Sequence, residues 1–129
     1  MQALKRIFYV EDEPDIMAVA QLVLQDIGGF ELETAVCGAD ALETIVKFQP
    51  DLILLDVMMP GMDGPTTLQA LRKLEGLQQT PVLFMTAKVQ IEELEQYKVL
   101  GAIDVIPKPF DPMTLSAQIE AIWRRHHGE

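Results

Sequence analysis

The sequence is poor in cysteine, in basic residues and in long apolar runs. Its 129 residues include a single cysteine, Cys37, which excludes a disulfide within the chain and favours a reducing compartment. No apolar stretch approaches the ~20 residues needed to span a bilayer, and the apolar run 7–10 is too short for a signal peptide. We therefore expect a cytoplasmic protein without membrane insertion.

Basic residues are half as numerous as acidic ones. The chain has 10 Lys and Arg against 20 Asp and Glu, a formal net charge of −10, and its basic residues form no cluster. Phosphate backbones are bound by clustered Lys and Arg, so direct binding of nucleic acid is not expected. Hydrophobic residues make up 49% of the chain, which argues against disorder and allows one domain with a packed core.

Short apolar runs alternate with helical patterns from one end of the chain to the other. The runs cover residues 7–10, 30–36, 52–55, 81–85 and 103–106, and the helical patterns cover 14–27, 38–48, 65–76, 91–100 and a last segment that starts near Asp111. Residues 52–55 are apolar without alternation, which is typical of a strand buried on both faces. This alternation predicts a doubly wound α/β fold, in which helices cover both faces of a parallel sheet.

Four polar residues stand where the predicted strands end. Asp12 follows the first strand, Asp56 ends the third, Thr86 ends the fourth and Lys108 follows the fifth. The carboxyl ends of parallel strands meet at one edge of the sheet, and neighbouring strands are only ~5 Å apart. We therefore expect these side chains to converge on one crevice.

The residue types at this edge suit phosphoryl chemistry. Carboxylates with a divalent ion form an oxygen-rich site that fits Mg²⁺. Lys108 adds a positive charge and Thr86 a hydroxyl donor, and together these groups can stabilise a phosphoryl group during transfer. Taken singly, each residue has a structural explanation as a helix cap, a turn cap or a surface lysine. Their coincidence at one edge favours the functional interpretation.

Four segments carry a resemblance to a known family. They are Val10-Glu11-Asp12-Glu13, Leu54-Leu55-Asp56-Val57-Met58-Met59-Pro60-Gly61-Met62-Asp63-Gly64, Met85-Thr86-Ala87 and Lys108-Pro109-Phe110. In their order and spacing the chain resembles, from end to end, a response-regulator receiver domain of the chemotaxis-regulator kind, the phosphorylatable module of two-component signalling. The resemblance implies a flavodoxin-like sheet of five strands in the order 2-1-3-4-5 with five helices, and one receiver domain over residues 1–129.

The resemblance also implies roles for the acidic residues. Asp56 would be the nucleophile that takes a phosphoryl group from phosphohistidine on a histidine kinase or a histidine phosphotransfer protein. Asp12 and Asp56 would bind Mg²⁺, for which Mn²⁺ can substitute, together with the backbone carbonyl of Met58. Glu11 would act mainly through a water molecule on the metal.

The same resemblance assigns the remaining site residues and the output. Lys108 would pair with the acyl phosphate, Thr86 would hydrogen-bond it, and the Lys108–Pro109 peptide bond is expected to be cis. The protein would be a signalling phosphoacceptor that catalyses only its own phosphorylation and dephosphorylation. Its phosphorylation would switch the binding of a downstream target protein or effector domain, and a weak homodimer is compatible with this role. Whether the chain acts alone or belongs to a longer protein stays open.

Three positions near the site bear on how such a switch would work. Val105 stands three residues before Lys108, where members of the family often carry Tyr or Phe, so the usual aromatic coupling to the threonine is in doubt. An equally good interpretation makes Val105 a core residue of the last strand and leaves the switch to Thr86. Met58 and Lys88 occupy positions that tune the lifetime of the phosphoryl group in the family.

The first helix carries more apolar surface than one core-facing stripe requires. Ile16, Val19, Ala20, Val23 and Ile27 recur at helical spacing and are expected to face the sheet. Met17 and Leu24 fall off that stripe. Our hypothesis is that they contact the phosphodonor together with Pro109 and Phe110, against the alternative that they are simply partly buried.

Three other functions were weighed against the receiver. A haloacid-dehalogenase-like phosphatase needs a second Asp two residues after its nucleophile, and here that residue is Met58. A flavin- or nucleotide-binding protein would place a phosphate-binding loop after the first strand, where Glu11, Asp12 and Glu13 would repel the ligand. A degenerate receiver that signals by binding alone is the remaining alternative, and the intact set of site residues argues against it.

Overall fold

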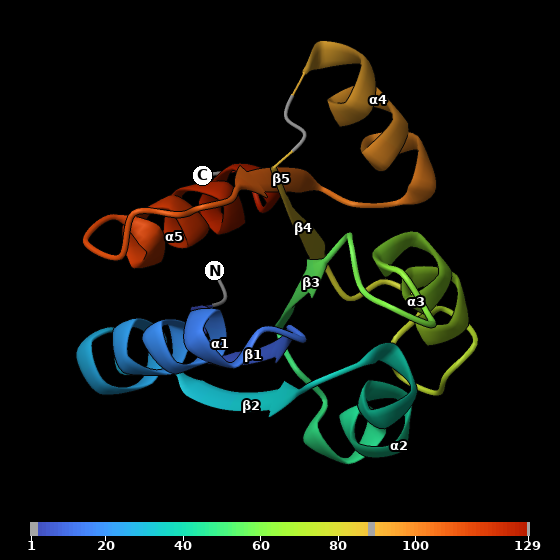
Figure 1. Cartoon of the computed structure of the whole chain (residues 1–129), viewed down its shortest axis with the longest axis horizontal. Helices are drawn as coiled ribbons and strands as arrows, with labels where there is room; N and C mark the ends of the chain where they lie inside the picture. Colours follow the sequence, from blue (N-terminus) through green and yellow to red (C-terminus); the bar gives the residue numbers. More distant parts are fainter. Residues whose placement is uncertain (1–2, 88–89, 129) are drawn as a thin grey trace.

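The computed structural model describes residues 3–87 and 90–128 and contains one five-stranded sheet (Figure 1). The strands are β1 (Arg6–Val10), β2 (Glu31–Ala35), β3 (Leu52–Asp56), β4 (Val82–Thr86) and β5 (Asp104–Pro107). All pairings are parallel, in the order β2-β1-β3-β4-β5. The predicted doubly wound α/β fold and its strand order are confirmed.

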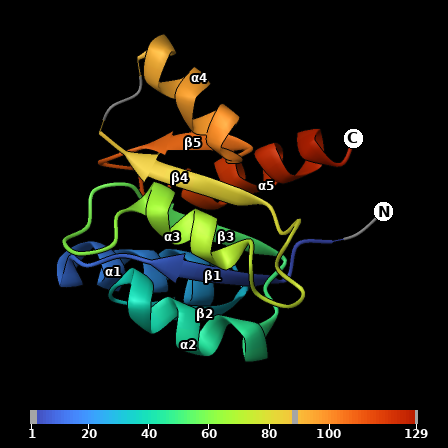
Figure 2. The same ribbon diagram turned by 90° about the vertical axis from the view of Figure 1, so that its right-hand side faces the viewer.

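Helices cover both faces of this sheet (Figure 2). They are α1 (Pro14–Gln21), continued by the π-helical segment η1 (Leu22–Ile27), then α2 (Gly38–Phe48), α3 (Gly64–Leu71), α4 (Ile91–Leu100) and α5 (Leu115–His126). Two apolar clusters fill the space between the sheet and the helices, one on each face of the sheet. One contains α1, η1 and α5, and the other contains α2, α3 and α4. Burial on both faces explains why β3 and β4 are apolar without alternation.

Alternate residues of each strand feed the two clusters. On β1, Ile7 and Tyr9 face α1 and α5, whereas Phe8 and Val10 face the other helices. This follows from the two-residue period of a strand. Residues that are two positions apart on β1 therefore lie on the same face of the sheet. This matters for the site because Glu11 is two residues after Tyr9.

The expectation about the first helix was partly wrong: Ala20 and Val23 are buried as expected, but the core-facing stripe also takes in other residues. Met17 and Leu24 are buried in the core, whereas Val19 and Ile27 are 39% and 72% exposed. The helix is apolar on nearly every side, so periodicity alone could not choose between two adjacent stripes. Its last turn is also π-helical, with Gly28 N donating to Val23 O at 2.8 Å, and this wider turn rotates Ile27 away from the sheet.

Two other helix boundaries differ from the sequence patterns. Helix α3 ends at Leu71, well before Gly76, and a series of turns follows it. Helix α5 starts at Leu115 because the chain first makes a separate turn around Asp111, whose Oδ1 accepts from Met113 N at 2.9 Å. The bounds of α2 and α4 are those expected, and the Lys108–Pro109 bond is cis, also as expected.

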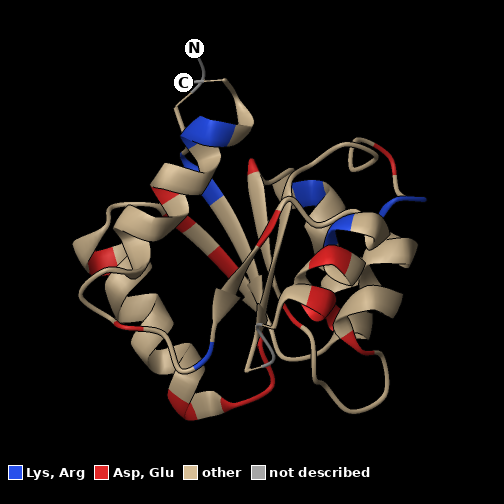
Figure 3. Ribbon diagram, turned by 90° about the horizontal axis from the view of Figure 1, so that it is seen from above, with Lys and Arg blue, Asp and Glu red and all other residues tan. Residues whose placement is uncertain are grey.

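The charges are distributed as the composition suggests. Acidic residues are spread over several helices and loops, whereas the C-terminal turn of α5 carries basic residues (Figure 3). Cations at the C-terminus of a helix interact favourably with its dipole. This local explanation accounts for the basic residues of α5.

Candidate functional site

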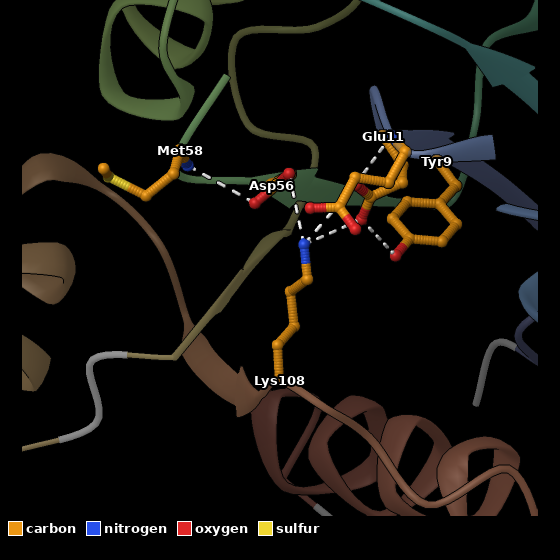
Figure 4. A network of polar contacts seen from close by, with 6 residues as sticks. Tyr9, Glu11, Asp56, Met58 and Lys108 are labelled. Atoms are coloured by element: carbon orange, nitrogen blue, oxygen red, sulfur yellow. Dashed lines mark hydrogen bonds and ion pairs between the residues drawn. The ribbon is translucent and has the colours of Figure 1, made fainter. Parts of the chain in front are cut away.

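Glu11, Asp56 and Lys108 converge at the carboxyl edge of the sheet, as expected (Figure 4). Asp56 and Thr86 are the last residues of β3 and β4, Glu11 follows β1 and Lys108 follows β5. Glu11, Asp56 and Thr86 are 1%, 2% and 2% exposed, so this edge of the sheet holds buried polar groups inside an apolar fold. Buried polar groups of this kind must be paired with each other or with a ligand.

Lys108 joins the two ends of the acidic cluster. Its Nζ lies 3.1 Å from Glu11 Oε1 and 3.2 Å from Asp56 Oδ2, and its side chain is 14% exposed. Burial by itself lowers the pKa of Lys108, but the two carboxylates outweigh burial and the pKa is raised. The ammonium group is therefore charged throughout the physiological range. The backbone of Lys108 also donates to Thr86 O at 2.9 Å, which ties the loop after β5 to the end of β4.

Glu11 is held by donors from three directions. Tyr9 Oη donates to Glu11 Oε1 at 3.0 Å, and Glu13 N donates to Oε2 at 3.2 Å. Lys108 Nζ reaches both oxygens, at 3.1 and 3.4 Å. Tyr9 was not among the residues expected at the site. The available signal was its spacing, because a residue two before Glu11 on a strand faces the same side.

The pKa of the Asp56 carboxyl is unusually high. Its Oδ1 accepts from Met58 N at 3.3 Å. Burial raises the pKa of this carboxyl, the nearby Glu11 carboxylate raises it further, and Lys108 lowers it, with a net pKa of about 7. One lysine does not compensate the clustered carboxylates, so a further cation would be favoured here.

The acidic residues provide a set of atoms that fits a metal ion. Glu11, Asp12 and Asp56 each offer one carboxylate oxygen, and these three atoms lie within 4.8 Å of one another. Asp12 Oδ1 is buried and has no hydrogen-bond partner within residues 3–87 and 90–128. A buried carboxylate oxygen without a donor is costly unless a ligand engages it. Oxygen ligands from one or two carboxylates are what Mg²⁺ uses in phosphoryl-transfer sites.

The other predicted positions lie around this centre. The Met58 side chain is 66% exposed in the loop after β3, beside the site. Val105 is buried in the same cluster as Phe84 and Tyr97 and pairs with Phe84 across β4 and β5. This agrees with the core interpretation of Val105. Lys88 lies outside the described residues.

The family model of the response regulator receiver domain matches residues 7–120 of this chain. The chain belongs to the response-regulator receiver family. The segments through which the sequence resembles that family contain the site residues. The fold and the strand order agree with those expected from the resemblance. The protein is thus the phosphoacceptor module of a two-component system, as expected. Nothing in its described site favours the degenerate alternative.

Named relatives support the assignment to the receiver family. The chain is 38% identical over 120 residues to the DNA-binding dual master transcriptional regulator RpaA of Synechocystis, a match that covers 93% of this chain and 49% of RpaA. It is 37% identical over 121 residues to the alkaline phosphatase synthesis transcriptional regulatory protein PhoP of Bacillus subtilis, covering 94% and 49%. The chain spans about half the length of these curated relatives.

A solved receiver has the same three-dimensional arrangement. The chemotaxis protein CheY4 of Vibrio cholerae superimposes with a TM-score of 0.85 at 33% identity, over 93% of this chain and 99% of CheY4. The likeness thus extends over nearly the whole of both chains. Within the part of the chain that the structure describes, no helix is long and apolar enough to cross a membrane.

Proposed function

We propose that Asp56 is the phosphoacceptor and that its donor is phosphohistidine on a histidine kinase or a histidine phosphotransfer protein. The observation that carries this proposal is the position of the Lys108 ammonium, between the carboxylates of Glu11 and Asp56 at a buried strand end. A phosphoryl group on Asp56 would place its negatively charged oxygens beside the carboxyl group that Lys108 already contacts. The family membership of the chain supports the same assignment.

The transfer would be an in-line displacement. A carboxylate oxygen of Asp56 forms a bond to phosphorus while the bond between phosphorus and the histidine nitrogen breaks, and that nitrogen keeps the electron pair. Lys108 would balance charge on the phosphoryl oxygens, and the Thr86 hydroxyl would donate a hydrogen bond to one of them. Attack requires the ionised form of Asp56, so its raised pKa opposes the reaction at low pH.

Asp12, Asp56 and the backbone carbonyl of Met58 would hold Mg²⁺ or Mn²⁺, with Glu11 at the margin of the metal site. The ion, when bound, would supply positive charge that neutralises the phosphoryl oxygens. Asp12 Oδ1, which has no hydrogen-bond partner among the described residues, and the carboxylate oxygen of Asp56 close to Asp12 support these assignments. The buried Asp12 Oδ1, without a hydrogen-bond donor in the described part of the chain, makes Asp12 a good candidate for a direct ligand.

The same residues would also reset the signal. Water attacks phosphorus of the acyl phosphate, the bond to the Asp56 oxygen breaks, and inorganic phosphate leaves with Asp56 again a carboxylate. The protein would therefore catalyse only its own phosphorylation and dephosphorylation. A dianionic group at the edge of the sheet would favour loop arrangements that bring Thr86 and Lys108 to it, and this would change a binding surface.

An apolar hollow beside the site is a candidate docking surface for the donor. It has a volume of about 290 Å³, and its lining includes Ile16 and Val19 of α1 and Pro109 and Phe110 after β5. Lys108 also lines it, so a partner seated there would lie beside the proposed phosphoacceptor. Met17 and Leu24, which were expected at this contact, are core residues. Ile16 and Val19 take their place in the proposal.

The output also belongs to the proposal. A downstream target protein or an effector domain would recognise the phosphorylated form. RpaA is named as a DNA-binding regulator, whereas the net charge of −10 argues against direct DNA contact by this chain. We expect a cytoplasmic location and at most a weak homodimer.

The proposal is tested by incubation with acetyl phosphate and Mg²⁺, followed by measurement of the intact mass. The wild type should gain one phosphoryl group, and neither Asp56→Asn nor the metal-free sample should do so. Modification of Asp56→Asn to the same extent would move the phosphoacceptor elsewhere. If no adduct forms, tight binding of beryllofluoride would indicate fast hydrolysis, and absence of both beryllofluoride and Mg²⁺ binding would overturn the proposal.

A further inference from the structure

Tyr9 brings one hydroxyl from the apolar core to the base of the site. Its side chain is fully buried in the cluster between the sheet, α1 and α5. Its Oη donates to Glu11 Oε1 at 3.0 Å, and Figure 4 shows this hydroxyl directed at the Glu11 carboxylate. A buried tyrosine usually places its hydroxyl on a partner, and here the partner is a residue of the acidic cluster.

The hydrogen bonds of Glu11 leave it little capacity for another ligand. A carboxylate has about four lone-pair sites. Oε1 accepts from Tyr9 and Lys108, and Oε2 accepts from Glu13 N and, at 3.4 Å, from Lys108. Asp12 Oδ1, by contrast, is buried with no hydrogen-bond partner in the described part of the chain. The two adjacent acidic residues are therefore unequal, one saturated with donors and the other open.

We propose that Tyr9 is a positioning residue, which commits Glu11 to Lys108 and thereby lowers the affinity of the unphosphorylated protein for Mg²⁺. This inference rests on the proposed function, because it assumes that the acidic cluster binds Mg²⁺. With the Tyr9 bond in place, Glu11 offers no free lone pair to the ion or to its hydration shell. Without that bond, Oε1 regains one acceptor site and adds its charge to the metal site.

The chemistry of the hydroxyl suits this role. The Tyr9 hydroxyl donates a hydrogen bond to the Glu11 carboxylate, with Oη 3.0 Å from Oε1. Phenylalanine has the same ring without that donor. Tyr9→Phe therefore changes the capacity of Glu11 while leaving the packing of the ring intact.

The test is a calorimetric titration of Mg²⁺ into Tyr9→Phe and wild-type protein. Tyr9→Phe should bind Mg²⁺ about fivefold more tightly, which corresponds to about 1 kcal/mol, the usual contribution of one hydrogen bond. Tyr97→Phe is the matched control, since Tyr97 is the other tyrosine and lies in the opposite cluster, against Phe84. It should leave the affinity unchanged.

The same substitution in Glu11→Gln protein shows whether Tyr9 acts through Glu11 or whether its loss damages the site in general. If Tyr9 acts through Glu11, then in Glu11→Gln protein the further change Tyr9→Phe should not alter Mg²⁺ affinity. An independent variant works in the opposite direction. In Tyr97→Phe protein, where Tyr9 is the sole tyrosine, incorporation of 3-fluorotyrosine supplies a stronger donor to Glu11 and should weaken Mg²⁺ binding. This second variant covers the case in which Tyr9→Phe does not fold.

The outcomes distinguish this inference from the proposed function. The role of Tyr9 would be overturned if folded Tyr9→Phe bound Mg²⁺ as tightly as the wild type or more weakly. It would also be overturned if Tyr9→Phe raised the Mg²⁺ affinity of Glu11→Gln protein as much as that of the wild type. In that case wild-type protein would still bind Mg²⁺ and take a phosphoryl group on Asp56. If the wild type neither binds Mg²⁺ nor becomes phosphorylated, the proposed function itself fails.

Discussion

Lys108 Nζ lies 3.2 Å from Asp56 Oδ2, although the two residues belong to the ends of β5 and β3, which are not neighbours in the sheet. The lysine side chain reaches across the end of β4 to make this ion pair. It also contacts Glu11 at the end of β1, so one side chain connects three strand ends. The site is therefore fixed by the sheet and not by a single loop.

Removal of the Lys108 charge should destabilise the metal-free protein. At pH 8 the ammonium group, whose pKa is raised, is fully charged, and Lys108→Met would leave Glu11 and Asp56 buried without a cation. Breaking a buried ion pair in this way should cost about 3 kcal/mol in the free energy of unfolding, measured by urea denaturation. Lys47 is exposed, so Lys47→Met should stay within about 0.5 kcal/mol of the wild type. Equal losses in both variants would contradict the importance of the buried cluster.

Asp56 should make the metal-free protein less stable as the pH rises. Its folded-state pKa, about 7, lies above its ordinary value of 3.8, so the folded state holds the proton more tightly than the unfolded state. Stability should therefore fall between about pH 4 and pH 7. Asp56→Asn should remove this slope and be more stable than the wild type by roughly 2 kcal/mol at pH 8, with little difference at pH 4. A parallel pH dependence of the two thermal unfolding midpoints would argue against it.

Leu24 should behave as a core residue. Its side chain is fully buried between the first helix and the sheet. Leu24→Ala should lower the free energy of unfolding by about 3 kcal/mol, because it removes apolar contacts and leaves a cavity. Leu22, two residues away, is 52% exposed, and Leu22→Ala should change stability by less than about 0.5 kcal/mol. The opposite ranking would mean that a different face of the first helix, with Leu22 inward, packs on the sheet.

The hollow between α1 and the loop after β5 should matter for one type of donor only. The double variant Val19→Ala, Phe110→Ala should slow phosphotransfer from the cognate histidine donor by about tenfold, the effect of losing about 1.4 kcal/mol of contact. Phosphorylation by acetyl phosphate, which needs no docking surface, should keep its wild-type rate. Val99→Ala on α4, at a side chain 87% exposed, is a suitable control. Equal slowing with both donors would indicate damage to the site and not to docking.

The strands and the main site residues were predictable because local signals and topology agree. Apolar runs such as Leu52–Leu55 have few alternatives to a buried strand, and polar residues that end such runs must meet at one edge of a parallel sheet. Asp12, Asp56 and Lys108 were found by this rule. Their mutual distances follow from strand order, which the sequence also indicated.

The face of the first helix and the role of Tyr9 were not predictable in the same way. When a helix is apolar on most sides, the pattern alone does not choose between Met17 and Ile16 as the residue that faces the sheet. The π-helical turn depends on tertiary packing, since Ser116 of α5 approaches the Val23 carbonyl there at 3.5 Å. The bond from Tyr9 to Glu11 depends on a side-chain rotamer, which spacing allows but does not determine.

The π-helical segment η1 makes the length of the first helix adjustable. A π turn holds one residue more than an α turn, and Gln25 and Asp26 within it are exposed. Deletion of either one could return the segment to ordinary helical hydrogen bonding without removing a core side chain. The carboxylate cluster lies at the opposite end of α1, next to Pro14. In evolutionary terms, the first helix can change its length at η1 without displacing the carboxylate cluster at the edge of the sheet.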